Sequence, residues 1–123
     1  MPLTEEIISN RYSISAYSKN SITINEVEYQ KSLILAASQL ELDWPVNQLE
    51  LIEDQHLKQI MEFNPEVILL GTGERQKFPH PSIFAYFGEK GIGLEVMDTG
   101  ALCRTFNILV AEDRAVVAAV IFD

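Results

Sequence analysis

The sequence predicts a single α/β domain folded as a three-layer sandwich, and three features indicate it. Residues 67–70 and 115–122 are almost wholly apolar, as expected of strands that are covered on both faces. Two stretches with apolar residues at helical spacing separate these strands from each other and from a third strand at residues 94–97. The resulting order of strand, helix, strand, helix, strand is typical of parallel strands joined by right-handed crossovers.

An antiparallel meander is predicted for the N-terminal third of the chain. Its turns are expected at Ser18-Lys19-Asn20 and at Asn25-Glu26, because these residue types favour tight turns between segments that alternate apolar and small side chains. The strands that we expect here are residues 12–17, 21–24, 27–29 and 32–37. This meander either extends the parallel sheet or lies against it, which makes the sheet mixed. Residues 1–10 are expected to be a loosely held lead-in.

Helices are expected over residues 55–63 and 83–90 and after Asp98-Thr99-Gly100. Asp54, Ser82 and Thr99 can each cap one of them, because their side-chain oxygens accept hydrogen bonds from the free amide groups of a first turn. Asn64 and Gly91 suit the left-handed exits of the first two helices. The residues expected to be buried are Leu57, Ile60 and Met61, then Ile83, Phe84 and Phe87, then Leu102, Phe106, Leu109 and Val110.

Composition excludes several classes of partner. The formal net charge is −9 and there is no cluster of Lys and Arg, so we expect no nucleic-acid partner, because binding to phosphate backbones is driven by cations. The longest apolar run, residues 115–122, is far shorter than the roughly 20 residues that a membrane helix needs, so no membrane insertion is expected. No export signal is visible, and the single Cys103 precludes an internal disulfide. A cytoplasmic location is therefore expected.

The turns after two parallel strands form a possible ligand site. Gly71, Thr72 and Gly73 follow the strand at residues 67–70, Arg75 lies in the same loop, and Thr99 and Gly100 begin the third helix. The carboxyl ends of neighbouring parallel strands share one edge of the sheet, where a turn and a helix start can bind a small anion. The alternative is that the glycines serve only a tight turn. The spacing does not match a dinucleotide fingerprint or a phosphate loop.

No catalytic set of residues and no metal or cofactor is predicted. Asp98 either favours the helix start or acts as a general base, without a paired nucleophile. Cys103 is either reactive or buried, and burial is the commoner outcome for a free cysteine. His56 and His80 lack companions at metal-ligand spacing. Asn107 either bonds a neighbouring loop or faces water.

A proline-stiffened loop offers a possible protein interface. Phe78, Pro79 and His80 lie between the Gly71–Gly73 turn and the second helix, and prolines reduce the cost of ordering a loop when a partner binds. Phe78 is a candidate aromatic anchor, a residue type that tends to dominate interfaces. Trp44 is expected in the core instead.

A set of motifs also resembles a known family. They are PEVILLGTGER at residues 65–75, GIGLEVMDT at 91–99, Ala101, TFNIL at 105–109 and EDRAV at 112–116. In this order they resemble the small Mth-like α/β family, in particular the branch that contains a mitochondrial NADH dehydrogenase (complex I) assembly factor. The resemblance implies a three-layer fold with a mixed sheet, no agreed catalytic residues, and action through protein contacts.

Two hypotheses of function follow. The first is a non-enzymatic interaction or assembly module that has a protein partner. On this hypothesis its role resembles the assembly of a respiratory complex. The second is a binder of a small anionic metabolite, or a weak enzyme, with its site at the Gly71–Gly73 and Asp98–Gly100 loops. An apolar edge strand would also permit a homodimer.

Overall fold

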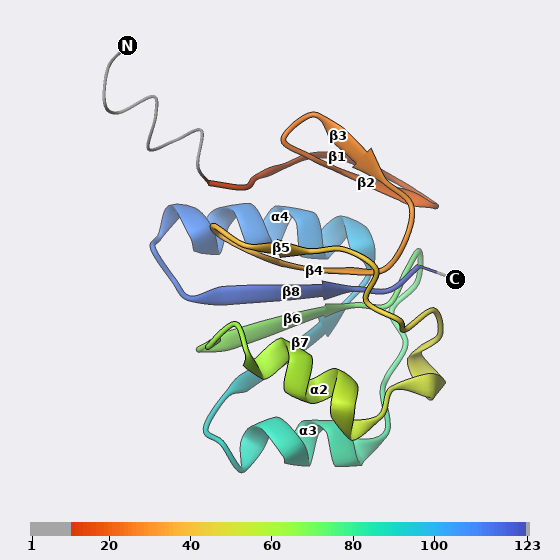
Figure 1. Ribbon diagram of the computed structural model, residues 1–123, viewed down its shortest axis with the longest axis vertical. Coiled ribbons are helices and arrows are strands. Elements are labelled where there is room, and N and C mark those ends of the chain that lie inside the picture. Colours follow the sequence, from red (N-terminus) through yellow and green to blue (C-terminus); the bar gives the residue numbers. More distant parts are fainter. Residues whose placement is uncertain (1–10, 123) are drawn as a thin grey trace.

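A mixed sheet with strand order β5-β4-β8-β6-β7 forms the centre of the computed structural model, which describes residues 11–122 (Figure 1). Its strands are β4 (Leu33–Ala36), β5 (Leu40–Glu41), β6 (Val67–Gly71), β7 (Gly93–Met97) and β8 (Val116–Val120). As predicted, β6 runs parallel to both of its neighbours, with Gly71 beside Met97 of β7 and Val120 of β8. The N-terminal lead-in expected at residues 1–10 lies outside the described residues.

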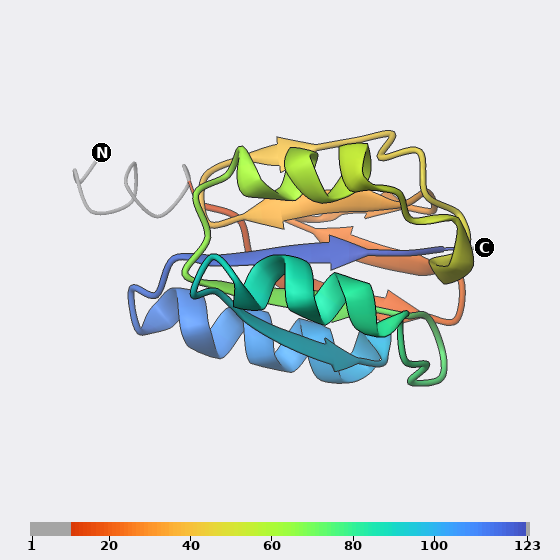
Figure 2. The same cartoon turned by 90° about the horizontal axis from the view of Figure 1, so that it is seen from below.

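Helices and a second sheet cover both faces of this central sheet. Successive side chains of a strand point to opposite faces, so Val116, Ala118 and Val120 pack toward α4 (Thr99–Ala111). The intervening Val117 and Ala119 pack toward α2 (Asp54–Met61) and α3 (Pro81–Gly88). Figure 2 shows α2 and α3 in front of the strands. The predicted three-layer α/β sandwich with a mixed sheet is confirmed, and both faces of β8 are buried.

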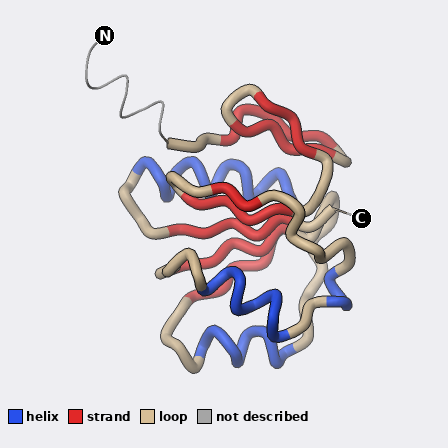
Figure 3. The backbone as a smooth tube through the Cα atoms, in the orientation of Figure 1, coloured by secondary structure: helices blue, strands red, loops and turns tan. Residues whose placement is uncertain are grey.

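The second sheet is antiparallel and separate from the first (Figure 3). It consists of β1 (Ile14–Ser18), β2 (Ser21–Ile24) and β3 (Val27–Tyr29). Asn25 and Glu26 join β2 to β3 with φ angles of 46° and 71°, the left-handed geometry that a two-residue hairpin turn needs. The predicted hairpins are therefore confirmed. The strand predicted at residues 32–37 is present as β4, but its place in the meander is wrong, because β4 pairs antiparallel with β8 in the central sheet. The short β5 was not predicted.

Asn107 joins the small sheet to α4. Its side-chain oxygen accepts a hydrogen bond from the Ile14 N–H at 2.9 Å, and its amide nitrogen donates to the Ile14 carbonyl at 2.7 Å. The register of β1 shifts between Ile14 and Ala16. Of the two roles open from the sequence, Asn107 therefore takes the one of bonding a neighbouring segment.

Replacing Asn107 with alanine is expected to lower the free energy of unfolding by about 1–3 kcal/mol, because a partly buried N–H and C=O lose their partner. Urea unfolding followed by circular dichroism measures the change. Thr105→Ala on the same helix serves as the control, with an expected change within about 0.5 kcal/mol. An Asn107→Ala curve that overlays the wild-type curve would show that these two bonds contribute nothing.

Each helix begins one or two residues earlier than the sequence indicated. The N-terminal cap residues are Glu53 for α2, His80 for α3 and Asp98 for α4, and not Asp54, Ser82 and Thr99. The buried stripes agree with the prediction except at three positions. Phe84 is 39% exposed, and Met61 and Leu109 are only partly buried. Asn64 and Gly91 have left-handed φ angles of 54° and 71°, as expected, but α2 and α3 end earlier than predicted, at Met61 and Gly88.

Trp44 is buried, as expected, and lies in the core beneath α2 and α3. Its ring makes an edge-on contact with His56, with 6.4 Å between ring centroids. The backbone N–H of Glu53 donates to His56 Nδ1 at 2.9 Å, so this histidine stabilises the start of α2. None of the helices within residues 11–122 has the length and apolar character needed to cross a membrane.

Candidate functional site

The loops that follow β6 and β7 meet at one edge of the central sheet, as the parallel arrangement predicts. Two backbone hydrogen bonds link them directly. The Thr72 N–H donates to the Met97 carbonyl at 3.0 Å, and the Thr99 N–H donates to the Gly73 carbonyl at 2.8 Å. The side chain of Thr99 donates to the same Gly73 oxygen at 3.1 Å. The two predicted loops are thus held together as one rigid rim.

Thr72 organises the loop between β6 and α3. Its buried hydroxyl donates to the Arg75 carbonyl at 2.8 Å and accepts a hydrogen bond from the Lys77 N–H at 3.0 Å. Gly73 turns the chain with a φ of 100°, in the left-handed region that glycine tolerates without strain. The hydroxyl of Thr72 is therefore used to shape the loop, while the Arg75 side chain is exposed at its surface.

The start of α4 is closed by protein atoms. Asp98 accepts a hydrogen bond from the Ala101 N–H at 2.8 Å, so its carboxylate occupies the position that an anion would need. Thr99 is buried, and Gly100 lies under the ring of Tyr17, whose hydroxyl would be 2.7 Å from a Cβ atom added there. The structure thus uses Thr99 and Gly100 for packing and for joining the two loops.

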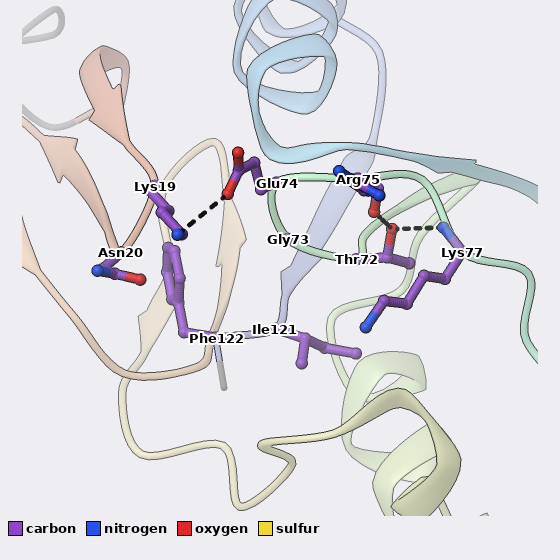
Figure 4. Close-up of a pocket in the computed structure, with 9 residues that line it drawn as sticks. All are labelled: Lys19, Asn20, Thr72, Gly73, Glu74, Arg75, Lys77, Ile121 and Phe122. Atoms are coloured by element: carbon purple, nitrogen blue, oxygen red, sulfur yellow. Dashed lines mark hydrogen bonds and ion pairs between the residues drawn. The ribbon is translucent and has the colours of Figure 1, made fainter.

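The rim contains two adjoining hollows instead of one shared pocket. The first, of about 200 Å³, lies beside Thr72 and Gly73 (Figure 4). Gly71, predicted as part of this site, is the last residue of β6 and does not line the hollow. Its lining residues are Lys19, Asn20, Thr72, Gly73, Glu74, Arg75, Lys77, Ile121 and Phe122. The second, of about 320 Å³, includes Asp98, Thr99, Gly100 and Arg104. Lys19 and Glu74 line both hollows, and a 3.7 Å ion pair joins them.

Six residues of the first hollow were not predicted as part of the site: Lys19, Asn20, Glu74, Lys77, Ile121 and Phe122. Lys19 and Asn20 form the β1–β2 turn, which only folding brings to this edge of the sheet. No sequence motif connects this turn with the loop after β6. Lys77 lies within the loop that the sequence did single out. Its position two residues after Arg75 was the one signal in the sequence that it belongs to this site.

A larger groove lies beside the Phe78 loop, between η1 (Leu49–Leu51) and the start of α3. Its volume is about 570 Å³, and its lining residues are Leu49, Glu50, Ile52, Phe78, Pro79, His80, Ser82 and Ile83. Phe78 is 75% exposed, the highest value among the large apolar residues described. Leu51, in the adjoining η1 turn, is 54% exposed.

The other residues of the predicted interface hold the groove in shape. Pro79 is buried. His80 Nδ1 accepts a hydrogen bond from the Ser82 N–H at 3.1 Å and lies 2.9 Å from the Ser82 hydroxyl. This capping interaction fixes the first turn of α3 against the loop, so Phe78 projects from a rigid base.

Cys103 is buried on α4. Burial raises the pKa of its thiol to about 11, with Arg104 opposing the rise and Asp98 adding to it. The thiol is therefore protonated at neutral pH, and of the two roles open from the sequence the inert one is supported. Within residues 11–122 no group of three or more His, Cys, Asp or Glu side chains is placed to hold a metal ion.

Comparisons with known proteins agree with the predicted family resemblance. A family model described as a protein of unknown function (DUF498/DUF598) matches residues 14–121. The 13 kDa major membrane protein of Francisella tularensis is 36% identical over 122 residues, covering 98% of this chain and 99% of that protein. A Bordetella pertussis protein described as a Mth938-like domain has a similar solution structure, with a TM-score of 0.75 at 31% identity, covering 89% of this chain and 85% of that one.

A further relative connects the chain to an assembly factor. NADH dehydrogenase (ubiquinone) 1 alpha subcomplex assembly factor 3 from Xenopus tropicalis is 37% identical over 82 residues. The match covers 65% of this chain and 45% of the assembly factor, so the chain corresponds to less than half of that protein's length. The resemblance to a small Mth-like family related to a complex I assembly factor is thereby confirmed.

Proposed function

This chain belongs to the family described as a protein of unknown function (DUF498/DUF598), and from that kinship and its surface we propose that it is a non-enzymatic, assembly-type interaction module. Its relatives include proteins named as assembly factors of an NADH dehydrogenase. Such a module holds a segment of another protein and releases it without chemical change. A role in building a respiratory complex, and a cytoplasmic location, form part of this proposal.

The observation that supports a docking role is the exposure of Phe78 beside an apolar groove. An aromatic ring that is 75% exposed contributes little to folding stability, because most of its surface remains in water. Aromatic side chains are enriched among residues that dominate protein interfaces. Because the hydrogen bonds of His80 and the burial of Pro79 fix the loop, little ordering is needed when a partner binds.

The charges around the groove indicate the chemistry of its occupant. Glu50 lines the groove, and Glu53 and Asp54 follow directly after Ile52 in the chain, all exposed. The whole chain has a net charge of −9. Complementary charge speeds association and selects partners. The proposed occupant is therefore a basic amphipathic segment of a client protein, with large apolar side chains next to Lys or Arg.

A peptide-binding measurement tests the proposal. The probe is a fluorescently labelled peptide with leucines on one helical face and lysines on the other, and a second peptide has glutamates in place of the lysines. We expect the intact chain to bind the lysine peptide, and Phe78→Ala to weaken that binding about tenfold or more. Melting temperature should be unchanged in Phe78→Ala.

Ile108→Ala is the matched control, because Ile108 is also an exposed apolar residue, at 58%, but lies on α4. It should bind the lysine peptide as the wild type does. Equal binding by Phe78→Ala and wild type would reject the groove as the docking surface. Preference for the glutamate peptide would reject a basic client.

A further inference from the structure

Positive charge gathers at one place on this acidic molecule. The chain has 9 Lys and Arg residues against 18 Asp and Glu. Lys19, Arg75 and Lys77 line the hollow of about 200 Å³ beside the Gly71–Gly73 turn, and Arg104 lines the adjoining one. Among residues 11–122, Glu74 is the one acidic residue that lines the first hollow, and it is paired with Lys19. The described lining therefore has more positive than negative side chains, whereas the whole chain has a net charge of −9.

The two lysines face this hollow from different sides. In Figure 4 the side chain of Lys77 extends toward the centre of the hollow, near Ile121, while Lys19 lies on the opposite side, next to the ring of Phe122. Among residues 11–122, no carboxylate pairs with Lys77, whereas Glu74 pairs with Lys19. Ile121 and Phe122 are buried, at 2% and 6% exposure, and supply an apolar floor.

We propose that this hollow binds a small carboxylate that has a short apolar portion. Lys77 receives the carboxylate group, and the apolar portion lies on Ile121 and Phe122. The volume is below the roughly 300–1,000 Å³ of sites for drug-sized ligands, so the ligand is a small organic acid. The Lys19–Glu74 pair is exposed, and such pairs contribute little stability, so Lys19 can turn to the ligand at small cost.

This site shares Thr72, Gly73 and Arg75 with the anion site expected from the sequence, but its main donors are different. There the expected donors were the glycine turn, Arg75 and the start of α4. The Thr72 N–H already donates to the Met97 carbonyl, the N–H and hydroxyl of Thr99 donate to the Gly73 carbonyl, and the Ala101 N–H donates to Asp98. Here the donors are side chains from the β1–β2 turn and the β6–α3 loop. This hollow and the Phe78 groove have no lining residue in common. A negative result at one site therefore leaves the proposal for the other unaffected.

Titration of the ¹⁵N-labelled full chain with butyrate, followed by NMR, tests the site, with chloride added at equal ionic strength as the reference. The amide signals of Asn20, Gly73 and Phe122 should shift in a saturable way. Lys77→Gln should weaken this binding about tenfold, because a charge-assisted hydrogen bond is lost. Lys58→Gln removes the same charge from an exposed position on α2 and should leave the affinity within about twofold.

Three results would overturn the proposal. One is the absence of saturable shifts at these amides, and another is equal butyrate affinity in Lys77→Gln and wild type. The third is binding of inorganic phosphate as tightly as butyrate, since phosphate has no apolar portion to use the floor. Phosphate at least about tenfold weaker than butyrate supports the assigned ligand class.

Discussion

Replacing Phe106 with alanine is expected to lower the free energy of unfolding by about 3–5 kcal/mol, the usual cost of deleting a buried aromatic ring. Phe106 is 0% exposed, and it lies in α4 within a core that also contains Ile14 and Ile22 of the small sheet. Leu69 and Ala118 of the central sheet belong to the same core. Removal of the ring therefore leaves a cavity between the two sheets.

Urea unfolding followed by circular dichroism gives this free energy directly. Ile108→Ala, two residues away on α4, removes an exposed side chain and should change stability by no more than about 0.5 kcal/mol. A loss of less than about 1 kcal/mol for Phe106→Ala would mean that α4 does not join the two sheets as described. The position of Lys19 at the rim depends on that junction, because Lys19 lies in the turn of the small sheet.

Cys103 is expected to react with an alkylating reagent about 100-fold more slowly in the folded chain than in the urea-unfolded chain at pH 8. The reason is that the thiolate is the reactive form, and burial raises the pKa from the ordinary 9.0 to about 11. Steric shielding adds to this effect. A native rate equal to the unfolded rate would contradict the burial of this thiol.

The same pKa shift predicts how stability changes with pH. Because the folded pKa is higher than the unfolded pKa, folding favours the neutral thiol. The associated stability is fully present below about pH 9 and is lost as the pH rises from about 9 through about 11. Tyrosines and lysines also titrate there, so the wild type is compared with Cys103→Ala. The variant should lose less stability over this range, and parallel curves would refute the assignment.

The parallel half of the fold could be predicted because its strands have a recognisable local sequence pattern. β6 and β8 are continuous apolar runs, and such runs suit strands that are covered on both faces. β4 is also a continuous apolar run, Leu33–Ala36, so its burial on both faces could be read in the same way. It was assigned to the meander because it follows the hairpins directly in the chain, and its pairing with β8 is a long-range contact.

The helix starts were misplaced because several neighbouring residues are chemically able to cap. At α3 a stronger rule applies, since Pro81 occupies the first helical position and leaves the cap to His80. At α4 both Asp98 and Thr99 qualify by type. Thr99 instead bonds the Gly73 carbonyl on the neighbouring loop, a contact that no local pattern reveals.

The candidate site was predicted in part. The sequence correctly predicted that the Gly71–Gly73 and Asp98–Gly100 segments lie at one edge of the sheet, because neighbouring parallel strands end at the same edge. It did not reveal that these turns bond each other, nor that Lys19 comes from the far hairpin to line the hollow. Phe78 was identified as a possible anchor from its residue type, and its exposure is a property of the folded loop alone.

Photocrosslinking in living cells tests the docking role most directly. The photoreactive residue benzoylphenylalanine replaces Phe78 in one version of the chain and Ile108 in another. We predict a discrete adduct at position 78 only, joined to a segment of a different protein in which Lys or Arg flanks large apolar residues. No adduct at position 78, equal adducts at both positions, an acidic crosslinked segment, or a crosslink to a second copy of this chain would contradict the account.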